Sequence, residues 1–569
     1  MDSNKLIIRT LQSWGVSLYS GVTGGGVIHF LKNIDPYTNS TSNGIKFLNF
    51  GEYNAGFVPL GHYLASGKIA AAIATTGAAT KLISCGLSDA KLHDIPALYI
   101  VPVSGISTIG FSPLQDATLH GSNIILQLEA ELPGSVFVLD SQLTLAEKLA
   151  QAKNQLDHSK PVVLVLDNEQ LIVEHNEIPE LIIGENLDNK EEIDAESFID
   201  NFRKEIKGRR LIVLVGEEMA RYDNATELTS KFARQFQAAM VWSINGANAI
   251  DRNNPYGYGY ISFGGNDRAL SLFNSLNESD VLLILGACPD EYTVNFNKFS
   301  TGSTFFAGNI PDAYGLVDNS LVHFAQGRYY HFQGPLNTLL ESLIVSSSQN
   351  PFRNIPAKLA PQNLNDKPFN PARENYVDMA SLYQQLDQWW PENSIGFDDV
   401  CLAYKDRQYV TQRPNNNIKF YSLYRGSAMG GAFGAAVGAK IASPEKSVFL
   451  FTGDGCFRLF SGTMAEVRDL GLIVFLLNNE TLGIVAQGLG KIMPDIKKER
   501  YHAALHSIDY CGVAKAHGWD AEYLDPDLSN INNLFDRMTD KNKLSRSLLI
   551  EVPVDALQLL GSNPRLKNL

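Results

Sequence analysis

The sequence predicts an α/β protein with three domains, each built on a doubly wound parallel sheet. A chain of 569 residues is larger than one hydrophobic core usually supports, so several domains are expected. Short β-branched and aromatic runs alternate with Ala- and Leu-rich stretches from end to end, which is typical of layered α/β proteins. Two stretches, 176–197 and 346–374, break this alternation and have the composition of linkers.

These linkers divide the chain into an N-terminal domain at 1–180, a central domain at 195–345 and a C-terminal domain at 370–569. Each segment has the size of an independent domain. In the central segment, "RLIVLVGEEM" and "DVLLILGACPDEYT" each predict a strand followed by a turn. Because no phosphate-binding glycine loop stands out in this domain, we expect no FAD.

Composition narrows the range of partners and locations. The 61 acidic and 47 basic side chains give a net charge of -14, which disfavours nucleic acids and anionic membranes as partners. The longest apolar runs are much shorter than the roughly 20 residues of a membrane helix, and the N-terminus lacks the features of a secretory signal. Five cysteines without a Cys-x-x-Cys pair argue against a disulfide framework and a zinc site. We therefore expect a cytoplasmic protein.

Two polar motifs follow consecutive apolar runs in the C-terminal domain. The run "KSVFLFT" leads into Gly-Asp-Gly at 453–455, and "LIVFLL" leads into Asn-Asn at 478–479, with a helix-compatible stretch at 461–471 between them. In a strand–helix–strand unit, both strand ends emerge at the same edge of a parallel sheet, where ligands bind. A carboxylate and an amide oxygen suit Mg²⁺, and the glycines let the backbone approach a diphosphate.

This spacing resembles the signature of the thiamine-diphosphate-dependent enzymes in the acetohydroxyacid synthase and pyruvate decarboxylase superfamily. The resemblance implies that thiamine diphosphate and Mg²⁺ bind here, with Asp454, Asn479 and the carbonyl of Thr481 holding the metal. It also implies that Ile484 and Gln487 face the substrate pocket. The cofactor contacts implied in this region are Gly453, Asp454, Gly455, Cys456, Asn479, Thr481, Gly483 and Ile484.

A motif in the N-terminal third contains a candidate catalytic carboxylate. The stretch "FLNFGEYNAGFVPLGHYLASGK" predicts a strand, then Glu52, then a helix of small residues that ends in Ala-Ser-Gly. It resembles the segment that carries the activating glutamate of the same superfamily. That resemblance implies that Glu52 acts on the pyrimidine ring of the cofactor. From the residue pattern alone, a solvated carboxylate at a helix N-terminus is the alternative.

Two neighbouring stretches resemble further segments of the same superfamily, and the resemblance implies that they contact the cofactor. "GVTGGGVIHF" at 21–30 resembles its Gly-Val-Pro-Gly-Gly loop and implies cofactor contacts from Thr23, Gly24 and Gly25. "ATTGAATKLISCGLSDAKLHDIP" at 74–96 resembles its Thr-Ser-Gly-Pro-Gly-Ala-Thr-Asn segment and implicates Thr76. Both stretches depart from the superfamily pattern: Thr23 replaces proline in the first, and in the second Ala78 and Ala79 stand where Pro-Gly is common and Lys81 replaces Asn. Because these departures fall around the expected substrate side of the site, they bear on the identity of the substrate rather than on that of the cofactor.

Two further N-terminal residues are candidate catalytic groups. "GFSPLQDATLHG" resembles the segment in which a glutamine reaches toward the reacting centre, which implicates Gln115. His93 is a second candidate because it lies in a loop beside Asp94-Ile95-Pro96, close to the matching segment. Polar loop composition alone accounts for Gln115 equally well.

The C-terminal domain carries one more matching segment, "FYSLYRGSAMGGAFGAAVGAKIASPEKS". It resembles the segment that places an apolar wedge under the bent cofactor. The resemblance implies that Met429 is this wedge and that the carbonyl of Ser427 accepts a hydrogen bond from the cofactor's 4′-amino group.

In this superfamily, the glutamate domain and the diphosphate domain of one chain contribute to different active sites. The resemblance therefore implies a homodimer or homotetramer with active sites at the subunit interface. The activity we favour is a decarboxylating carboligase of the acetolactate synthase type, which joins an acyl group from a 2-oxoacid to a carbonyl acceptor. The alternatives are a non-ligating 2-oxoacid decarboxylase, a 2-hydroxyketone lyase, a non-catalytic cofactor-binding homologue and a Mg²⁺ phosphohydrolase that uses Asp454.

Overall fold

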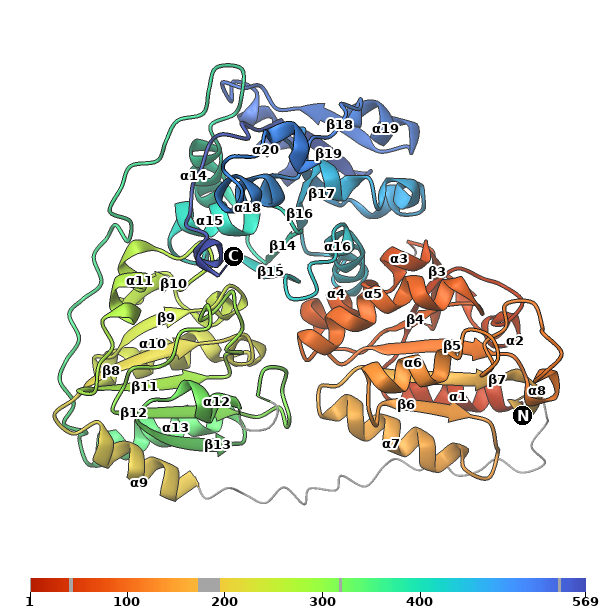
Figure 1. Ribbon diagram of the computed structural model, residues 1–569, viewed down its shortest axis with the longest axis horizontal. Coiled ribbons are helices and arrows are strands. Elements are labelled where there is room, and N and C mark those ends of the chain that lie inside the picture. Colours follow the sequence, from red (N-terminus) through yellow and green to blue (C-terminus); the bar gives the residue numbers. More distant parts are fainter. Residues whose placement is uncertain (1, 40–43, 172–194, 317–319, 541–543, 569) are drawn as a thin grey trace.

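The computed structural model describes residues 2–39, 44–171, 195–316, 320–540 and 544–568. Within these ranges the chain forms three sheets in which all neighbouring strands are parallel, at 18–167, 210–333 and 394–553. This confirms the predicted fold class. The three domains lie at the corners of a triangle (Figure 1). None of the described helices is both long and apolar enough to span a bilayer.

The N-terminal sheet has the strand order β2-β3-β1-β4-β5-β7-β6. Its strands are β1 (Leu18–Gly21), β2 (Asp35–Pro36), β3 (Lys46–Asn49), β4 (Ala71–Ile73), β5 (Leu98–Val103), β6 (Val136–Leu139) and β7 (Val162–Asp167). Its helices are α1 (Ser3–Ser13), α2 (Ile28–Leu31), α3 (Glu52–Ala55), α4 (Val58–Ser66), α5 (Ala78–Leu92), α6 (Ile124–Glu131), α7 (Leu145–Asp157) and α8 (Asn168–Leu171). Strand β7 is buried along its whole length, because helices cover both faces of a parallel sheet.

The central sheet has the order β10-β9-β8-β11-β12-β13. Its strands are β8 (Arg210–Val215), β9 (Ala239–Trp242), β10 (Gly257–Tyr260), β11 (Asp280–Leu285), β12 (Ser303–Gly308) and β13 (Arg328–Gln333). Its helices are α9 (Ala195–Glu205), α10 (Ala225–Phe236), α11 (Asp267–Asn274), α12 (Ser320–Phe324) and α13 (Leu336–Gln349). Strands β8 and β11 occupy the two apolar runs that predicted strands here.

The C-terminal sheet has the order β15-β14-β16-β17-β19-β18. Its strands are β14 (Ser394–Asp398), β15 (Ile418–Ser422), β16 (Val448–Gly453), β17 (Ile473–Asn478), β18 (Asp520–Tyr523) and β19 (Leu548–Pro553). Its helices are α14 (Met379–Trp389), α15 (Ala403–Thr411), α16 (Gly431–Ala442), α17 (Asp454–Phe457), α18 (Gly483–Ile492), α19 (Tyr510–Ala516) and α20 (Ile531–Thr539). Short 3₁₀ helices at Ser461–Leu470, Lys498–Tyr501 and Pro564–Lys567 complete this domain.

Three predicted stretches differ from the structure. The stretch at 461–471 forms a kinked 3₁₀ helix, with a non-helical backbone at Val467, and the preceding α-helical turn α17 begins at Asp454 itself. The predicted linker at 346–374 begins too early, because 346–349 form the end of α13, whose apolar face is buried against the sheet. Residues 176–194 of the other predicted linker lie outside the described residues, and 195–197 begin α9.

The N-terminal and C-terminal domains of the chain contact each other through α4 and α16, which lie side by side (Figure 1). A Cβ atom on Gly61 would lie 1.7 Å from the carbonyl oxygen of Ala435, and one on Gly438 would lie 2.0 Å from that of Val58. Glycines at these positions therefore let the two helix backbones touch.

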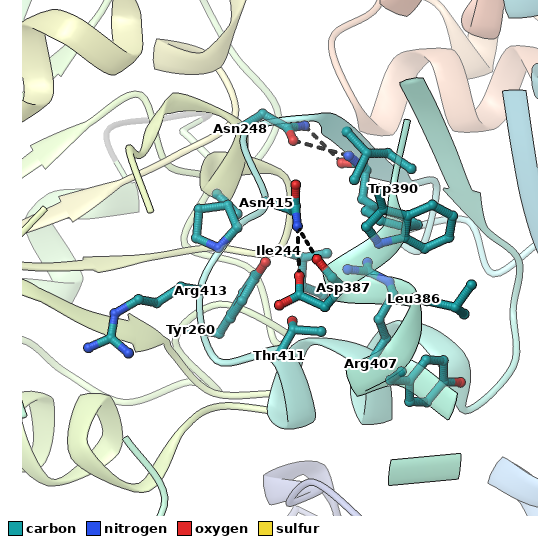
Figure 2. Close-up of a pocket in the computed structure, with 15 residues that line it drawn as sticks. Ile244, Asn248, Tyr260, Leu386, Asp387, Trp390, Arg407, Thr411, Arg413 and Asn415 are labelled. Atoms are coloured by element: carbon teal, nitrogen blue, oxygen red, sulfur yellow. Dashed lines mark hydrogen bonds between the residues drawn. The ribbon is translucent and has the colours of Figure 1, made fainter. Parts of the chain in front are cut away.

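Side chains of the central domain form hydrogen bonds with the C-terminal domain and so join the two domains (Figure 2). Asn248 donates to the carbonyl oxygen of Phe420 at 2.8 Å and accepts from its N–H at 3.1 Å. The Arg252 Nη1 of the central domain donates to the Asp387 carboxylate of the C-terminal domain at 3.1 Å. These bonds satisfy polar groups that the boundary buries.

Candidate active site

The C-terminal half of the candidate site lies where β14, β16, β17 and β19 end at one edge of their sheet. A cavity of about 220 Å³ lies at this edge. It is lined by ten of the eleven residues of this domain that the sequence singled out, namely Ser427, Met429, Gly453, Asp454, Gly455, Cys456, Asn479, Thr481, Gly483 and Ile484. The eleventh, Gln487, is not part of this lining. Because these residues follow neighbouring strands, the topology brings the Gly-Asp-Gly and Asn-Asn motifs together.

Asp454 is the residue whose surroundings most clearly favour a bound cation. It begins α17 and is 2 % exposed, and its Oδ2 has no hydrogen-bond partner among the described residues. Burial raises the pKa of this carboxyl group to about 6. A buried carboxylate oxygen without a partner is unfavourable, and a bound cation would remove that cost.

Asn479 and Thr481 complete an oxygen-rich donor set beside Asp454. The Asn479 Oδ1 accepts a hydrogen bond from the Thr481 N–H at 3.1 Å, which fixes the turn after β17. One carboxylate, one amide oxygen and one backbone carbonyl are hard ligands that suit Mg²⁺, which takes its remaining ligands from water and phosphate. The residues present therefore fit a Mg²⁺-bound diphosphate.

Met429 lies against the Gly-Asp-Gly turn. A Cβ atom on Gly455 would lie 3.3 Å from the Met429 terminal methyl group and 2.7 Å from Leu482. Ser427, two residues before Met429, has a φ of +49°. A serine in this left-handed region is strained and persists only where neighbouring contacts hold it.

The N-terminal half of the candidate site lies at the corresponding edge of the N-terminal sheet. Thr23–Gly25 follow β1, Glu52 begins α3 just after β3, and Thr76 follows β4. The Thr76 hydroxyl donates to the Gln115 Oε1 at 2.7 Å. A Cβ atom on Gly24 would lie 2.6 Å from the Thr75 hydroxyl oxygen, so the loops after β1 and β4 pack closely. The structure thus gathers the loops that carry Thr23–Gly25, Thr76 and Gln115.

The two halves do not merge within one chain. Among the described residues that line the 220 Å³ cavity, none belongs to the N-terminal domain. Glu52 is half-buried at the start of α3 and is not part of that lining.

His93 is not part of the cavity lining described above. It is 4 % exposed at the junction of the three domains, and its Nε2 accepts the backbone N–H of Arg425 at 3.3 Å. Burial, followed by the nearby Arg425 and Arg221 cations, lowers the His93 pKa well below its ordinary value. Its catalytic role stays a prediction that this position does not support.

Several residues of the cavity were missed by sequence reasoning. Val400–Leu402 follow the apolar run "SIGFD" of β14, so the strand-end rule that found Asp454 also points to them. Tyr292 comes from the central domain, and Gln558 and Arg565 come from the segment after β19. No local pattern identifies these three, since only the domain arrangement brings them to the cavity.

Comparison with protein families decides what binds here. The chain matches the models of the thiamine pyrophosphate enzyme N-terminal TPP binding domain over residues 1–122, the central domain over 199–306 and the C-terminal TPP binding domain over 403–552. The chain belongs to the thiamine pyrophosphate enzyme family. It is a thiamine-diphosphate-dependent enzyme, and the sequence prediction of this family is confirmed.

Curated relatives of this thiamine pyrophosphate enzyme are similar over most of its length. The acetolactate synthase isozyme 2 large subunit of Escherichia coli is 24% identical over 497 residues, which cover 86% of this chain and 84% of that protein. The acetolactate synthase large subunit of Lactococcus lactis is 23% identical and covers 85% of this chain and 82% of that protein.

A solved structure shares the fold of this enzyme. The thiamine diphosphate-dependent 4-hydroxybenzoylformate decarboxylase of Rhodococcus jostii RHA1 matches with a TM-score of 0.76 at 16% identity, covering 98% of this chain and 99% of that chain. At this identity the match shows the fold alone.

Proposed function

We propose that this enzyme is a decarboxylating carboligase that joins an acyl group from a 2-oxoacid to a carbonyl acceptor. The observation that carries the proposal is the similarity to acetolactate synthase large subunits, which extends over 85–86% of the chain in the two relatives named above. A non-ligating 2-oxoacid decarboxylase is the second candidate, because the solved structure with the same fold is a decarboxylase.

Each half of the site has a distinct task in this proposal. Thiamine diphosphate, when bound, supplies the electron sink that decarboxylation of a 2-oxoacid requires. Asp454, Asn479 and the Thr481 carbonyl would hold Mg²⁺ and the diphosphate. Met429 would pack against the cofactor, and the Ser427 carbonyl would accept a hydrogen bond from it. Glu52 would hold a proton at the pyrimidine end of the cofactor, and Gln115 would contact the substrate.

We further propose that the active enzyme is a homodimer, or a tetramer of two such dimers, with each site between two subunits. The cavity in the C-terminal domain lacks N-terminal residues of its own chain, so a second copy is the natural source of Glu52. The segment around Gln115 exposes two large apolar side chains, Phe111 (82% exposed) and Leu114 (92% exposed). Apolar side chains gathered in this way are typical of an interface.

Product analysis tests the proposed reaction. The holoenzyme is incubated with pyruvate alone and then with pyruvate and an aldehyde, and CO₂, free aldehyde and 2-hydroxyketones are measured, with Glu52→Gln as the inactive control. A carboligase releases CO₂ and accumulates a ligated hydroxyketone. Release of CO₂ with an equal amount of free aldehyde and no ligated product would instead identify a simple decarboxylase. Cleavage of an added 2-hydroxyketone without CO₂ would identify a lyase.

A further inference from the structure

The central domain has a ligand crevice that is filled by the protein itself. Its strand order reverses between β8 and β11, and the carboxyl end of a sheet at such a reversal is where doubly wound domains bind nucleotides. Glu217 follows β8 and Asp290 follows β11. Both carboxylates form ion pairs with Arg425, which belongs to the C-terminal domain, and the Arg425 Nε lies 2.6 Å from the Asp290 Oδ2.

The Arg425 side chain is only 3% exposed and forms further hydrogen bonds besides these two ion pairs. Its Nη1 donates to the carbonyl oxygen of Leu92, in the N-terminal domain, at 2.9 Å. The hydroxyl of Tyr424 donates to the same Asp290 carboxylate at 2.8 Å. One guanidinium group thus joins all three domains.

Such a buried ion-pair network is a weak source of stability, because desolvation of the charges offsets their attraction. Its distinctive property is geometric: a guanidinium group held by two carboxylates has a defined position and orientation. The space left in the crevice beside Glu218 and Gly286 is about 20 Å³, which accommodates little more than one water molecule. A dinucleotide does not fit between the ends of β8 and β11, although a separate cavity of about 560 Å³, lined by Glu217 and Arg221, lies between the three domains.

Arg425 directly precedes the loop 426–430, which carries Ser427 and Met429. The N-terminal domain holds the two ends of this loop: the Gly426 N–H donates to the Asp89 Oδ1 at 2.7 Å, and the Asn54 Nδ2 donates to the Gly430 carbonyl oxygen at 3.1 Å. The strained backbone of Ser427, with its φ of +49°, lies between these points. Arg425 adds the anchor to the central domain.

We propose that Arg425 is a positioning residue through which the central domain holds the cofactor loop in its working conformation. The crevice that could accept a nucleotide grips the Arg425 side chain, and this grip fixes the direction in which the Ser427 carbonyl and the Met429 side chain project. The inference rests on the proposed roles of Ser427 and Met429 at the cofactor. It assigns to the central domain a mechanical task in place of nucleotide binding.

The experiment compares Arg425→Lys with Arg210→Lys in the full-length holoenzyme. Arg210 forms a similar ion pair with Asp280 at 2.7 Å, but at the amino end of β8, on the opposite edge of the same sheet. Lysine keeps the charge at both positions and loses the two-pronged geometry. Circular dichroism and size-exclusion chromatography establish that both variants fold and assemble as the wild type does.

For Arg425→Lys we expect kcat to fall about tenfold or more with KM changed less than about threefold, as misplaced reacting groups produce. Faster amide hydrogen exchange over 424–432 in the cofactor-free protein gives a readout independent of activity. The near-ultraviolet circular dichroism of bound thiamine diphosphate changes as well. Arg210→Lys leaves all three at wild-type values. Titration of wild type with FAD and with ADP shows no binding at the crevice.

A second variant covers the case in which Arg425→Lys does not fold. Glu217→Gln preserves shape and weakens one of the two ion pairs, and it shifts kcat and hydrogen exchange in the same direction by about threefold. Wild-type kcat and exchange in a folded variant, or a lowered melting temperature alone, would overturn the inference, as would FAD or ADP binding in the crevice. Failure of wild type to bind thiamine diphosphate would instead overturn the proposed function.

Discussion

The hydroxyl group of Tyr53 donates a hydrogen bond of 2.5 Å to the carbonyl oxygen of Met429. Tyr53 directly follows Glu52, yet Glu52 does not line the cavity that contains Met429. In a dimer with its sites between subunits, the two adjacent residues would serve different sites: Glu52 would act on the partner's cofactor, while Tyr53 holds the wedge segment of its own chain. The α3 turn would then connect the two active sites of the dimer.

Hybrid dimers test whether the sites lie between subunits. Glu52→Gln subunits are mixed with Asp454→Asn subunits, and the hybrid is purified by means of two different affinity tags. If each site takes Glu52 from one chain and Asp454 from the other, the hybrid retains one intact site and about half of the wild-type activity. Each pure variant is inactive and serves as the control. An inactive hybrid would mean that both residues act within one chain.

Replacing Tyr53 with Phe removes the bond to Met429 and keeps the aromatic ring. We expect the free energy of unfolding to fall by about 1 kcal/mol, since the Met429 carbonyl loses its partner, and kcat to fall by about threefold to tenfold through displacement of the wedge. Steady-state kinetics and urea denaturation measure the two effects. Tyr258→Phe is the matched control, because the Tyr258 hydroxyl also donates to a backbone carbonyl, that of Lys358, at an exposed position. Equal effects of both substitutions would contradict the prediction.

The contact between α4 and α16 depends on Gly61. In Gly61→Ala, the new methyl group would lie 1.7 Å from the Ala435 carbonyl oxygen, so the helices must separate. We expect a loss of stability of about 3 kcal/mol or more, as overpacking in a tight interface produces. Chemical denaturation measures it. Gly462→Ala, whose methyl group would meet nothing within 4 Å, should change stability little. A Gly61→Ala protein as stable as Gly462→Ala would show that the two helices do not touch in solution.

The stability of the central domain should depend on pH through Glu218. Burial raises the pKa of the Glu218 carboxyl group to about 7, whereas in the unfolded chain it ionises near its ordinary pKa of about 4.5. The folded protein therefore keeps the proton to higher pH, and the stabilisation from protonated Glu218 is lost as the pH rises from about 4.5 to 7.

Glu218→Gln is neutral at every pH and should not show this loss. Relative to the variant, the wild type is expected to lose up to about 3 kcal/mol between pH 5 and 7.5. Denaturation series at several pH values provide the comparison, with Glu341→Gln, on the exposed side of α13, as the control. A constant difference across the pH range would show that Glu218 is ionised throughout.

The site could be predicted from sequence wherever its chemistry lies at the end of a strand. Asp454 and Asn479 follow β16 and β17, which neighbour each other in the sheet, so two short apolar runs were enough to place them together. The same rule applies to Val400–Leu402, which follow β14 and line the cavity. The type of helix at 461–471 could not be predicted, because a helix-favouring composition does not distinguish an α-helix from a 3₁₀ helix.

The sequence by itself determined the fold class, the family and the residues at the strand ends, because apolar runs and the polar residues after them are local patterns that define the edge of a parallel sheet. Only the tertiary structure decided that His93 is buried at a domain junction and that Arg425 occupies the crevice of another domain. The physical reason is distance along the chain: the carboxylate partners of Arg425 lie 135 and 208 residues away. No local pattern encodes which distant side chain will fill a crevice.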